Sequence, residues 1–168
     1  MKWIRTALCA LGMLACVSLS AFAAEYGEPN ITTETTMKEL RENPSIKGSG
    51  YYTYCNEWIE GSTQYDDTPI EGYVSYAAAE DAAEGMNLVI ENYNRGVQIT
   101  WQVYTPEEIA ENSSLGMVQL FYYPAEGSGG RYAIVLPGNG STITSEMEEG
   151  GSAASQLHAM GYTAVSYT

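Results

Sequence analysis

The pattern of apolar and polar residues begins with an apolar leader. An uncharged run, residues 6–20, follows the positive residues Lys2 and Arg5, and Ala21-Phe22-Ala23 then fits the small-x-small pattern of a cleavage site. We expect a signal peptide over residues 1–23 and a secreted or cell-envelope location. We also expect no stable membrane insertion once the leader is removed.

Two alternatives remain for this leader. An uncleaved membrane anchor would need a longer apolar run, and this one carries Thr6, Ser18 and Ser20. A lipoprotein would be modified at Cys16, but Met13-Leu14-Ala15-Cys16 is a poor lipobox and the apolar run continues past it. Both alternatives are weaker than a cleaved signal.

Helical periodicity is strongest between Asp81 and Asn94. Apolar residues recur there at spacings of three, four and seven, at Ala82, Met86, Val89, Ile90 and Tyr93. Asp81-x-x-Glu84 resembles a capping box, and Gly96 stands where a terminating glycine belongs. The pattern therefore predicts a helix over 81–94.

Three further helix starts carry capping residues. Thr36-x-x-Glu39 predicts a short helix over 36–43 that Pro44 ends, and Thr105-Pro106-Glu107-Glu108 predicts a single turn. Ser145-x-x-Glu148 predicts a helix with a Schellman-like stop at Gly161. Its inner stripe is expected at Met147, Gly151, Ala154, Leu157 and His158, and Gly151 is expected to let the helix lie close to the sheet.

Strand patterns fill the second half of the chain. Val97–Tyr104 alternates, with Val97, Ile99, Trp101 and Val103 on one side, and Gly116–Tyr123 is a second strand. Tyr132–Leu136 is almost continuously apolar, which predicts a strand buried on both faces, and 163–168 begins another. Between these patterns, residues 45–71 are expected to be loops with one strand at 51–55.

This order predicts an α/β fold. Strand, loop, helix and strand over 132–168 form a parallel βαβ unit, and the two earlier strands form an antiparallel lead-in to the same sheet. Residues 24–96 are expected to form a loop-rich, tyrosine-rich amino-terminal extension.

Charge and composition narrow the partners. The chain carries 21 Asp and Glu against 7 Lys and Arg, a net charge of −14, which argues against nucleic acid and against an anionic membrane surface. The single histidine, His158, excludes a site with several histidine ligands, and only Cys55 remains after leader removal, so no internal disulfide is possible. We expect no metal and no cofactor. The pairs Glu107-Glu108 and Glu148-Glu149 stand at helix starts and are expected to be solvated.

The loop that follows Leu136 is the candidate site. Gly138-Asn139-Gly140 lies where a parallel strand releases its chain at the carboxyl end, and ligands bind there in open α/β sheets. The local sequence is also compatible with a plain tight turn that needs positive φ. A dinucleotide-binding loop is disfavoured, because the third glycine of that motif is missing at Ile143.

Residues 97–168 resemble the amino-terminal part of an α/β-hydrolase of the acetyl-esterase or carboxylesterase type, as found in secreted bacterial members. The resemblance lies in Tyr132-Ala-Ile-Val-Leu-Pro-Gly-Asn-Gly140 and Leu157-His-Ala-Met-Gly-Tyr-Thr-Ala-Val165. It implies acyl transfer through a serine nucleophile, with an oxyanion hole at Asn139 and Gly140 supported by Gly138. Asn139 departs from the family's pattern, because it stands at the second glycine position of that loop.

The resemblance stops before the residues that would do the chemistry. No complete Gly-x-Ser-x-Gly is present, and the nearest match, around Ser152, falls on a predicted helix that also carries His158. No member of a Ser/Asp/His triad is therefore assigned. We expect residues 97–168 to be the first part of a hydrolase domain, inactive as it stands, whose whole would act on a small-molecule or glycan-linked ester.

A non-catalytic alternative comes from aromatic residues. Seven tyrosines and tryptophans crowd the region before the helix at Asp81: Tyr51, Tyr52, Tyr54, Trp58, Tyr65, Tyr73 and Tyr76. They are typical either of a glycan-binding or interaction domain, whose rings stack on sugars, or of amphipathic side chains that cover a core edge. The second interpretation is favoured, because the predicted helices are unusual for a sugar-binding module.

Overall fold

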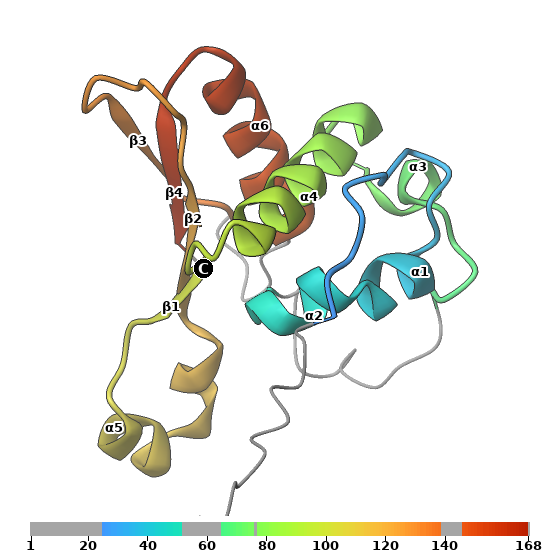
Figure 1. Ribbon diagram of the computed structural model, residues 1–168. Coiled ribbons are helices and arrows are strands. Elements are labelled where there is room, and N and C mark those ends of the chain that lie inside the picture. Colours follow the sequence, from blue (N-terminus) through green and yellow to red (C-terminus); the bar gives the residue numbers. More distant parts are fainter. Residues whose placement is uncertain (1–24, 52–64, 76, 139–145, 168) are drawn as a thin grey trace, which may run out of the picture.

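A computed structural model describes residues 25–51, 65–75, 77–138 and 146–167. In Figure 1 a small sheet stands beside a layer of helices. The elements are α1 (Met37–Glu42), α2 (Pro44–Ser49), α3 (Ile70–Tyr73), α4 (Ala79–Asn94), β1 (Thr100–Gln102), α5 (Pro106–Glu111), the 3-10 turn η1 (Ser113–Met117), β2 (Gln119–Tyr123), β3 (Tyr132–Val135), the π-helical turn η2 (Glu146–Gly151), α6 (Ser152–Ala159) and β4 (Thr163–Tyr167).

The sheet confirms a mixed α/β fold. Its strand order is β1-β2-β4-β3, with β1 and β2 antiparallel, β2 and β4 antiparallel, and β3 and β4 parallel. The parallel pair is joined through η2 and α6, as the sequence predicts for a βαβ unit. The predicted antiparallel lead-in is also present.

Helices cover one face of this sheet. Helices α4 and α6 lie against it, and α1, α2 and α3 lie beyond α4 (Figure 1). The strand registers place Trp101, Tyr132 and Ile134 on the opposite face, because cross-strand partners share a side and neighbours alternate. Those side chains are 49%, 70% and 66% exposed. Within the described residues no helix covers this face.

The prediction that residues 132–136 are buried on both faces is wrong. Strand β3 lies at the sheet edge and pairs only with β4 among the described strands, and Leu136 beyond it is 72% exposed. A continuous apolar run reports hydrophobicity, but burial depends on which elements pack against the strand.

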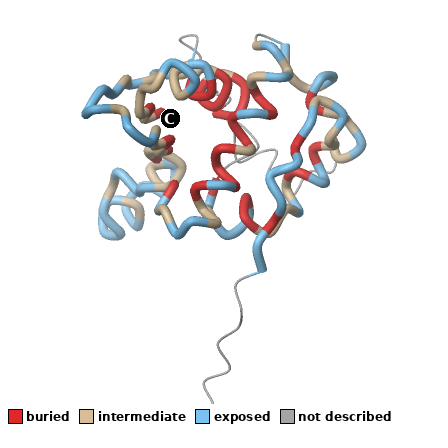
Figure 2. The backbone as a smooth tube through the Cα atoms, turned by 45° about the horizontal axis from the view of Figure 1, so that its top comes forward, coloured by how far each residue is buried: buried red, intermediate tan, exposed pale blue. Residues whose placement is uncertain are grey.

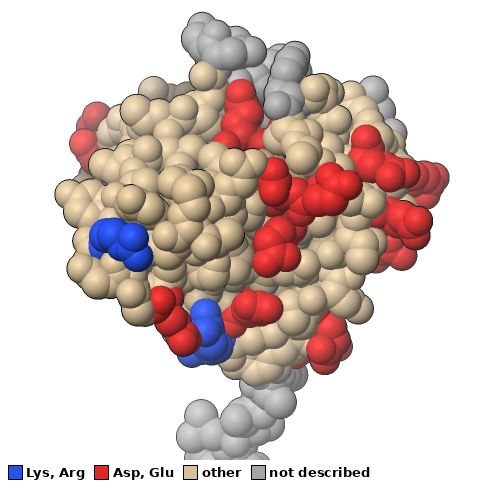
Figure 3. Space-filling view, turned by 90° about the horizontal axis from the view of Figure 1, so that it is seen from above, with Lys and Arg blue, Asp and Glu red and all other residues tan. Residues whose placement is uncertain are grey.

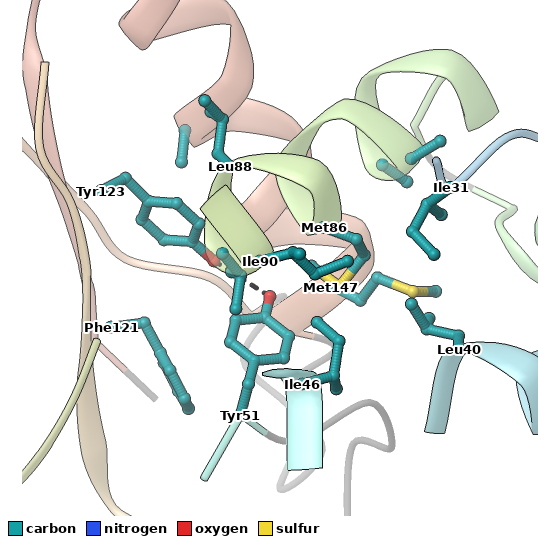
Figure 4. Close-up of a cluster of buried hydrophobic side chains, with 14 of the residues drawn as sticks. Ile31, Leu40, Ile46, Tyr51, Met86, Leu88, Ile90, Phe121, Tyr123 and Met147 are labelled. Carbon is teal, nitrogen blue, oxygen red and sulfur yellow. Dashed lines mark hydrogen bonds between the residues drawn. The ribbon is translucent and has the colours of Figure 1, made fainter. Parts of the chain in front are cut away.

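The core lies between the sheet and the amino-terminal helices. Figure 2 shows buried backbone concentrated at the centre of the molecule, and Figure 4 shows side chains from both halves of the chain meeting there. Phe121 and Tyr123 from β2 and Met86 and Ile90 from α4 are fully buried, as is Leu40 from α1. The extension and the sheet therefore share one hydrophobic cluster. The boundary at residue 96 stays a prediction.

Helix starts confirm two of the capping predictions. Thr36 accepts from the Glu39 N–H while Glu39 accepts from the Thr36 N–H, and Thr105 and Glu108 repeat this arrangement at α5. The cap at Asp81 is wrong. Helix α4 begins at Ala79, and the Asp81 carboxylate instead accepts from Gln156 Nε2 at 2.6 Å.

The extension is more helical than the sequence predicts. Pro44 does not end the structure after α1 but begins α2, capped by the Asn43 side chain, which accepts from the Ser45 and Ile46 N–H groups. A proline at a first helical position loses no hydrogen bond, so it starts a helix as readily as it stops one. Helix α3 also lies in the predicted loop region. The predicted strand at 51–55 lies outside the described residues except for Tyr51, which is not in a strand.

Asparagine side chains tie the polar segment before α1 to α4. Asn87 exchanges two hydrogen bonds with the backbone of Ile31, at 2.9 and 3.0 Å. Asn94 Nδ2 donates to the Gly27 carbonyl at 2.9 Å. The segment before α1 is neither helix nor strand, so its backbone groups need other hydrogen-bond partners, and these asparagine side chains supply them.

The strand predicted over 97–104 is shortened to β1. Ile99 is buried and Trp101 is largely exposed, so the alternating residues do not share one environment. Only Thr100–Gln102 pairs with β2, because β2 itself begins at Gln119 after the turn η1. The prediction of a strand over the whole of 97–104 is therefore wrong in its bounds.

The connection from β3 to β4 combines two helix types. The π-helical turn η2 passes into α6, and Met147 and Ala154 on the predicted inner stripe are fully buried. The stop at Gly161 is confirmed as a Schellman motif, with the Tyr162 N–H donating to the Leu157 carbonyl at 3.0 Å. Gly161 has φ of +78°, which favours glycine. The predicted cap Ser145 lies outside the described residues.

Candidate functional site

The candidate site lies at the carboxyl end of the parallel pair β3 and β4. After β3 the chain reaches Gly138, whose φ of +116° favours glycine and turns the backbone away from the strand direction. Asn139 and Gly140, the predicted oxyanion donors, lie outside the described residues. The direction of their N–H groups therefore stays a prediction, and Gly138 fits both a ligand loop and a tight turn.

A buried polar cluster lies where the chain re-enters the described fold, at Glu146. Ser166 Oγ of β4 donates to Glu146 Oε2 at 2.6 Å, and the Tyr123 hydroxyl of β2 lies 2.9 Å from Glu146 Oε1. The same hydroxyl lies 2.9 Å from the Tyr51 hydroxyl, the contact dashed in Figure 4. Four segments that are far apart in sequence therefore meet through side-chain oxygens.

Burial dominates the electrostatics of this cluster. Loss of water raises the pKa of Glu146 to about 8, although hydrogen bonds from Ser166 and Tyr123 oppose the shift. Burial, together with the negative charge that Glu146 carries when it ionises, raises the pKa of Tyr51 and of Tyr123 well above its ordinary value. Burial therefore favours the neutral form of all three groups.

Small residues allow η2 to approach this cluster. A side chain on Gly150 would collide with the Glu146 carboxylate. A Cβ on Gly151 would lie 3.1 Å from the Tyr51 hydroxyl and 3.3 Å from Met86 Cε, so this glycine brings η2 against α4 and Tyr51. The sequence predicts that Gly151 lets the helix lie close to the sheet, and the Tyr123 hydroxyl of β2 is indeed 3.5 Å from the position of that Cβ; the contact with α4 is an addition to the prediction.

Ser152 and His158 do not form a catalytic pair. Ser152 is the first residue of α6 and is buried, with its Oγ 3.5 Å from the Met147 carbonyl, so the interpretation as helix packing is confirmed. His158 is half-buried at the other end of α6 and lines a hollow of about 280 Å³ with Glu91 and Arg95. Neither residue contacts the carboxyl end of β3.

One acidic prediction fails in an informative way. Glu148 was expected to be a solvated residue at a helix start, but it is 6% exposed and its carboxylate accepts a hydrogen bond from the Ser75 N–H. Glu108 is exposed and caps α5, as expected. A π-helical turn that faces the core leaves less solvent around its carboxylates than a surface helix does.

Three tyrosines of the region before Asp81 pack in or against the core. Tyr51 is buried beside Phe121, with ring centroids 4.9 Å apart, and Tyr65 and Tyr73 form an edge-to-face pair at 5.4 Å against the hydrophobic cluster. These three residues fit the core-covering interpretation. Tyr52, Tyr54, Trp58 and Tyr76 lie outside the described residues.

The surface is acidic where Figure 3 displays it, with carboxylates spread across the face and basic groups sparse. The described residues contain no group of three or more His, Cys, Asp or Glu side chains placed to hold a metal ion. None of the described helices has the length and hydropathy of a membrane span.

No motif in the sequence identifies the Glu146 cluster. Along the chain, Glu146 is 20 residues from Ser166 and 23 residues from Tyr123, and Tyr123 is 72 residues from Tyr51. The four residues come from a predicted helix start, two strands and a loop. The one usable hint is the serine at position 166 inside an apolar strand, since a buried hydroxyl needs a partner. Comparison of the chain with family models, with curated proteins and with solved structures finds no match.

Proposed function

We propose that this chain forms the amino-terminal part of a secreted serine hydrolase that acts on carboxylic esters by acyl transfer. In this proposal the loop after β3 supplies oxyanion donors, the N–H groups of Asn139 and Gly140, and Gly138 supports the turn. The chain itself contributes no nucleophile and is inactive alone. The substrate would be a small-molecule or glycan-linked ester.

The observation that carries the proposal is the topology around β3. In hydrolases of this class one oxyanion donor comes from the loop between the third strand and the following helix. Here the third strand, β3, is parallel to β4 and is followed by a loop that begins at Gly138 and then by η2 and α6. The loop therefore stands at the end of the sheet where ligands bind.

The open side of β3 also supports the proposal. Tyr132 and Ile134 are largely exposed, and β3 pairs on one side only within the described residues. A parallel strand of this composition is normally covered, and an exposed apolar edge invites another strand. In a hydrolase domain that continues beyond β3, a further strand would pair with this edge and further helices would cover the face that carries Tyr132 and Ile134.

The test starts from the coding region that follows position 168. We expect it to encode a strand followed by Gly-x-Ser-x-Gly, and we expect the chain it completes to hydrolyse p-nitrophenyl acetate, with activity abolished by replacing that serine with alanine. A stop codon at this point, or a longer chain without hydrolysis, would contradict the proposal.

The oxyanion role has its own pair of variants in that longer chain. Asn139→Pro removes the backbone N–H, and Asn139→Ala keeps it. We expect the proline variant to lower kcat by about 10²–10³ relative to the alanine variant. Equal activity of the two would assign the donor elsewhere.

A second candidate function has one observation in its favour. An open groove of about 310 Å³ is lined by Tyr26, Tyr93, Ser49 and Gln98, with no charged residue in a chain of net charge −14. Tyrosine rings with neutral hydroxyl and amide groups suit a sugar. Titration of the chain with neutral oligosaccharides, monitored by tyrosine fluorescence and repeated with Tyr26→Ala, tests this alternative; no change in either protein removes it.

A further inference from the structure

We propose that Glu146, Tyr123 and Ser166 form a proton-dependent latch, which holds the first turn of η2 against the sheet while the carboxyl group is neutral and releases it when the group ionises. The latch joins three elements, because Glu146 begins η2, Tyr123 ends β2 and Ser166 lies in β4. Their exposed fractions are 3%, 0% and 0%. Among the described residues, Glu146 is the residue of η2 whose side chain is hydrogen-bonded to both β2 and β4.

The direction of the hydrogen-bond chain depends on the charge of the carboxyl. The Tyr123 hydroxyl has one proton but lies at hydrogen-bond distance from two oxygens, Tyr51 Oη and Glu146 Oε1. When Tyr123 donates to Tyr51, the contact with Oε1 needs the proton of the Glu146 carboxyl. Ionised Glu146 forces Tyr51 to donate to Tyr123 and Tyr123 to donate to the carboxylate, so the chain of hydrogen bonds reverses.

Among the described residues, no positive charge compensates an ionised carboxylate at Glu146. The titratable groups that act on it there are Tyr51 and Tyr123, which are neutral acids, and Glu149 on its own turn, which adds negative charge. On the α4 side, η2 meets the uncharged residues Gly85 and Met86.

Basic side chains do not reach this carboxyl in the described part of the chain. The two ion pairs found there, Arg41–Asp66 and Arg95–Glu126, lie elsewhere. A buried carboxylate that is hydrogen-bonded but has no cationic partner among the described residues is costly, and the simplest relief is movement of η2 that lets water reach the group.

The direction of the switch follows from the two protonation equilibria. The closed latch binds its proton with a pKa of about 8, whereas a hydrated carboxyl has the ordinary value of 4.5. Between these values opening releases one proton to solvent, so the equilibrium constant for opening rises by about tenfold for each unit of pH. Above the upper value the constant levels off.

The latch lies next to the predicted oxyanion segment. Asn139 and Gly140 precede Glu146 by only a few residues, and the chain re-enters the described fold at that glutamate. Control of the loop by the latch rests on the proposed function, whereas the latch itself does not. Hydrogen exchange measured on the chain without any substrate therefore separates the two.

The experiment is native-state hydrogen exchange from about pH 5 to about pH 8, corrected for the intrinsic rate. We expect exchange in residues 146–151 to accelerate by about tenfold per pH unit and to stay faster, at every pH, than exchange of the amides of the β2–β4 ladder. Glu146→Gln, which keeps the shape but cannot ionise, should show no such acceleration. Glu84→Gln, the same change on an exposed carboxylate of α4, should behave as the unmodified chain.

The outcomes that overturn the latch are defined for each protein. Equal exchange rates in residues 146–151 and in the ladder amides, after correction for the intrinsic rate, indicate global unfolding and not local release, and pH-independent exchange in residues 146–151 removes the switch. If Glu146→Gln does not fold, infrared spectroscopy of the unmodified chain decides. A protonated carboxylic acid gives its own carbonyl band, and absence of that band at about pH 6 overturns the proposal.

Discussion

Gly85 of α4 lies against Gly151 of η2 so closely that a Cβ on Gly85 would be 2.5 Å from the Gly151 carbonyl oxygen. This contact sets how near η2 and α6 lie to the central helix. Replacing Gly85 with alanine improves helix propensity by about 1 kcal/mol, but it forces two backbones apart. We expect a net loss of about 1–3 kcal/mol in the free energy of unfolding, as for other overpacked sites, measured by urea denaturation.

Gly116→Ala is the matched control. Its nearest neighbour would be the Cγ2 atom of Ile109 at 3.4 Å, the end of a side chain that is able to move. We expect a change within about 0.5 kcal/mol. Equal effects of the two substitutions would show that the contact between Gly85 and Gly151 is not tight in solution.

The exposed edge strand gives a second prediction, from a pair of isoleucines. Ile90 in α4 is fully buried, and Ile134 in β3 is 66% exposed. Ile90→Ala should cost about 2–5 kcal/mol, whereas Ile134→Ala should change the free energy of unfolding by less than about 0.5 kcal/mol. A large loss in Ile134→Ala would indicate that β3 is covered in solution, by another copy or another segment.

The elements predicted well from the sequence are those whose causes are local. The period of α4 holds because four of its five apolar positions, among them Met86 and Ile90, face the core. The capping boxes at Thr36 and Thr105 hold because a cap needs only residues three positions apart. The cap at Asp81 failed although its spacing was right, since a tertiary partner, Gln156, takes the carboxylate.

The candidate site was predictable only in part, because most of its contacts join residues that are far apart in the sequence. The position of the candidate loop at the carboxyl end of β3 follows from strand order, and Gly138 at that end has a positive φ. The pairing of Glu146 with Tyr123 and Ser166 depends on how three elements pack, which no short motif records. The prediction that β3 is buried on both faces was wrong for the same reason, because the burial of a strand depends on the elements that pack against it and not on its own hydrophobicity.

The Tyr123 hydroxyl gives a third prediction. Tyr123→Phe keeps the buried ring but leaves the Tyr51 hydroxyl and Glu146 Oε1 without this partner. We expect a loss of about 1–3 kcal/mol in the free energy of unfolding, the cost of unsatisfied buried polar groups. Tyr26→Phe, at a ring that is 55% exposed, serves as the control and should be neutral. Equal stability of the two variants would contradict the hydrogen-bond chain.

The dependence of global stability on pH gives the last prediction, and its sign is opposite to that of an ordinary surface carboxylate. Burial raises the pKa of Glu146 to about 8, against 4.5 for the free group. Between these values the folded chain holds a proton that the unfolded chain has released. The free energy of unfolding therefore falls as pH rises, by up to about 1.4 kcal/mol per pH unit.

Comparison with Glu146→Gln isolates this contribution, because general repulsion among the carboxylates of a chain of net charge −14 is nearly the same in both proteins. Urea denaturation at about pH 5, 6, 7 and 8 should show the unmodified chain losing stability relative to the variant at each step, with the difference constant above the upper pKa. Glu84→Gln should follow the unmodified chain. Parallel curves for Glu146→Gln and the unmodified chain would mean that Glu146 ionises normally, and a widening difference in the reverse direction would mean that a cation not near it in the fold stabilises its charged form.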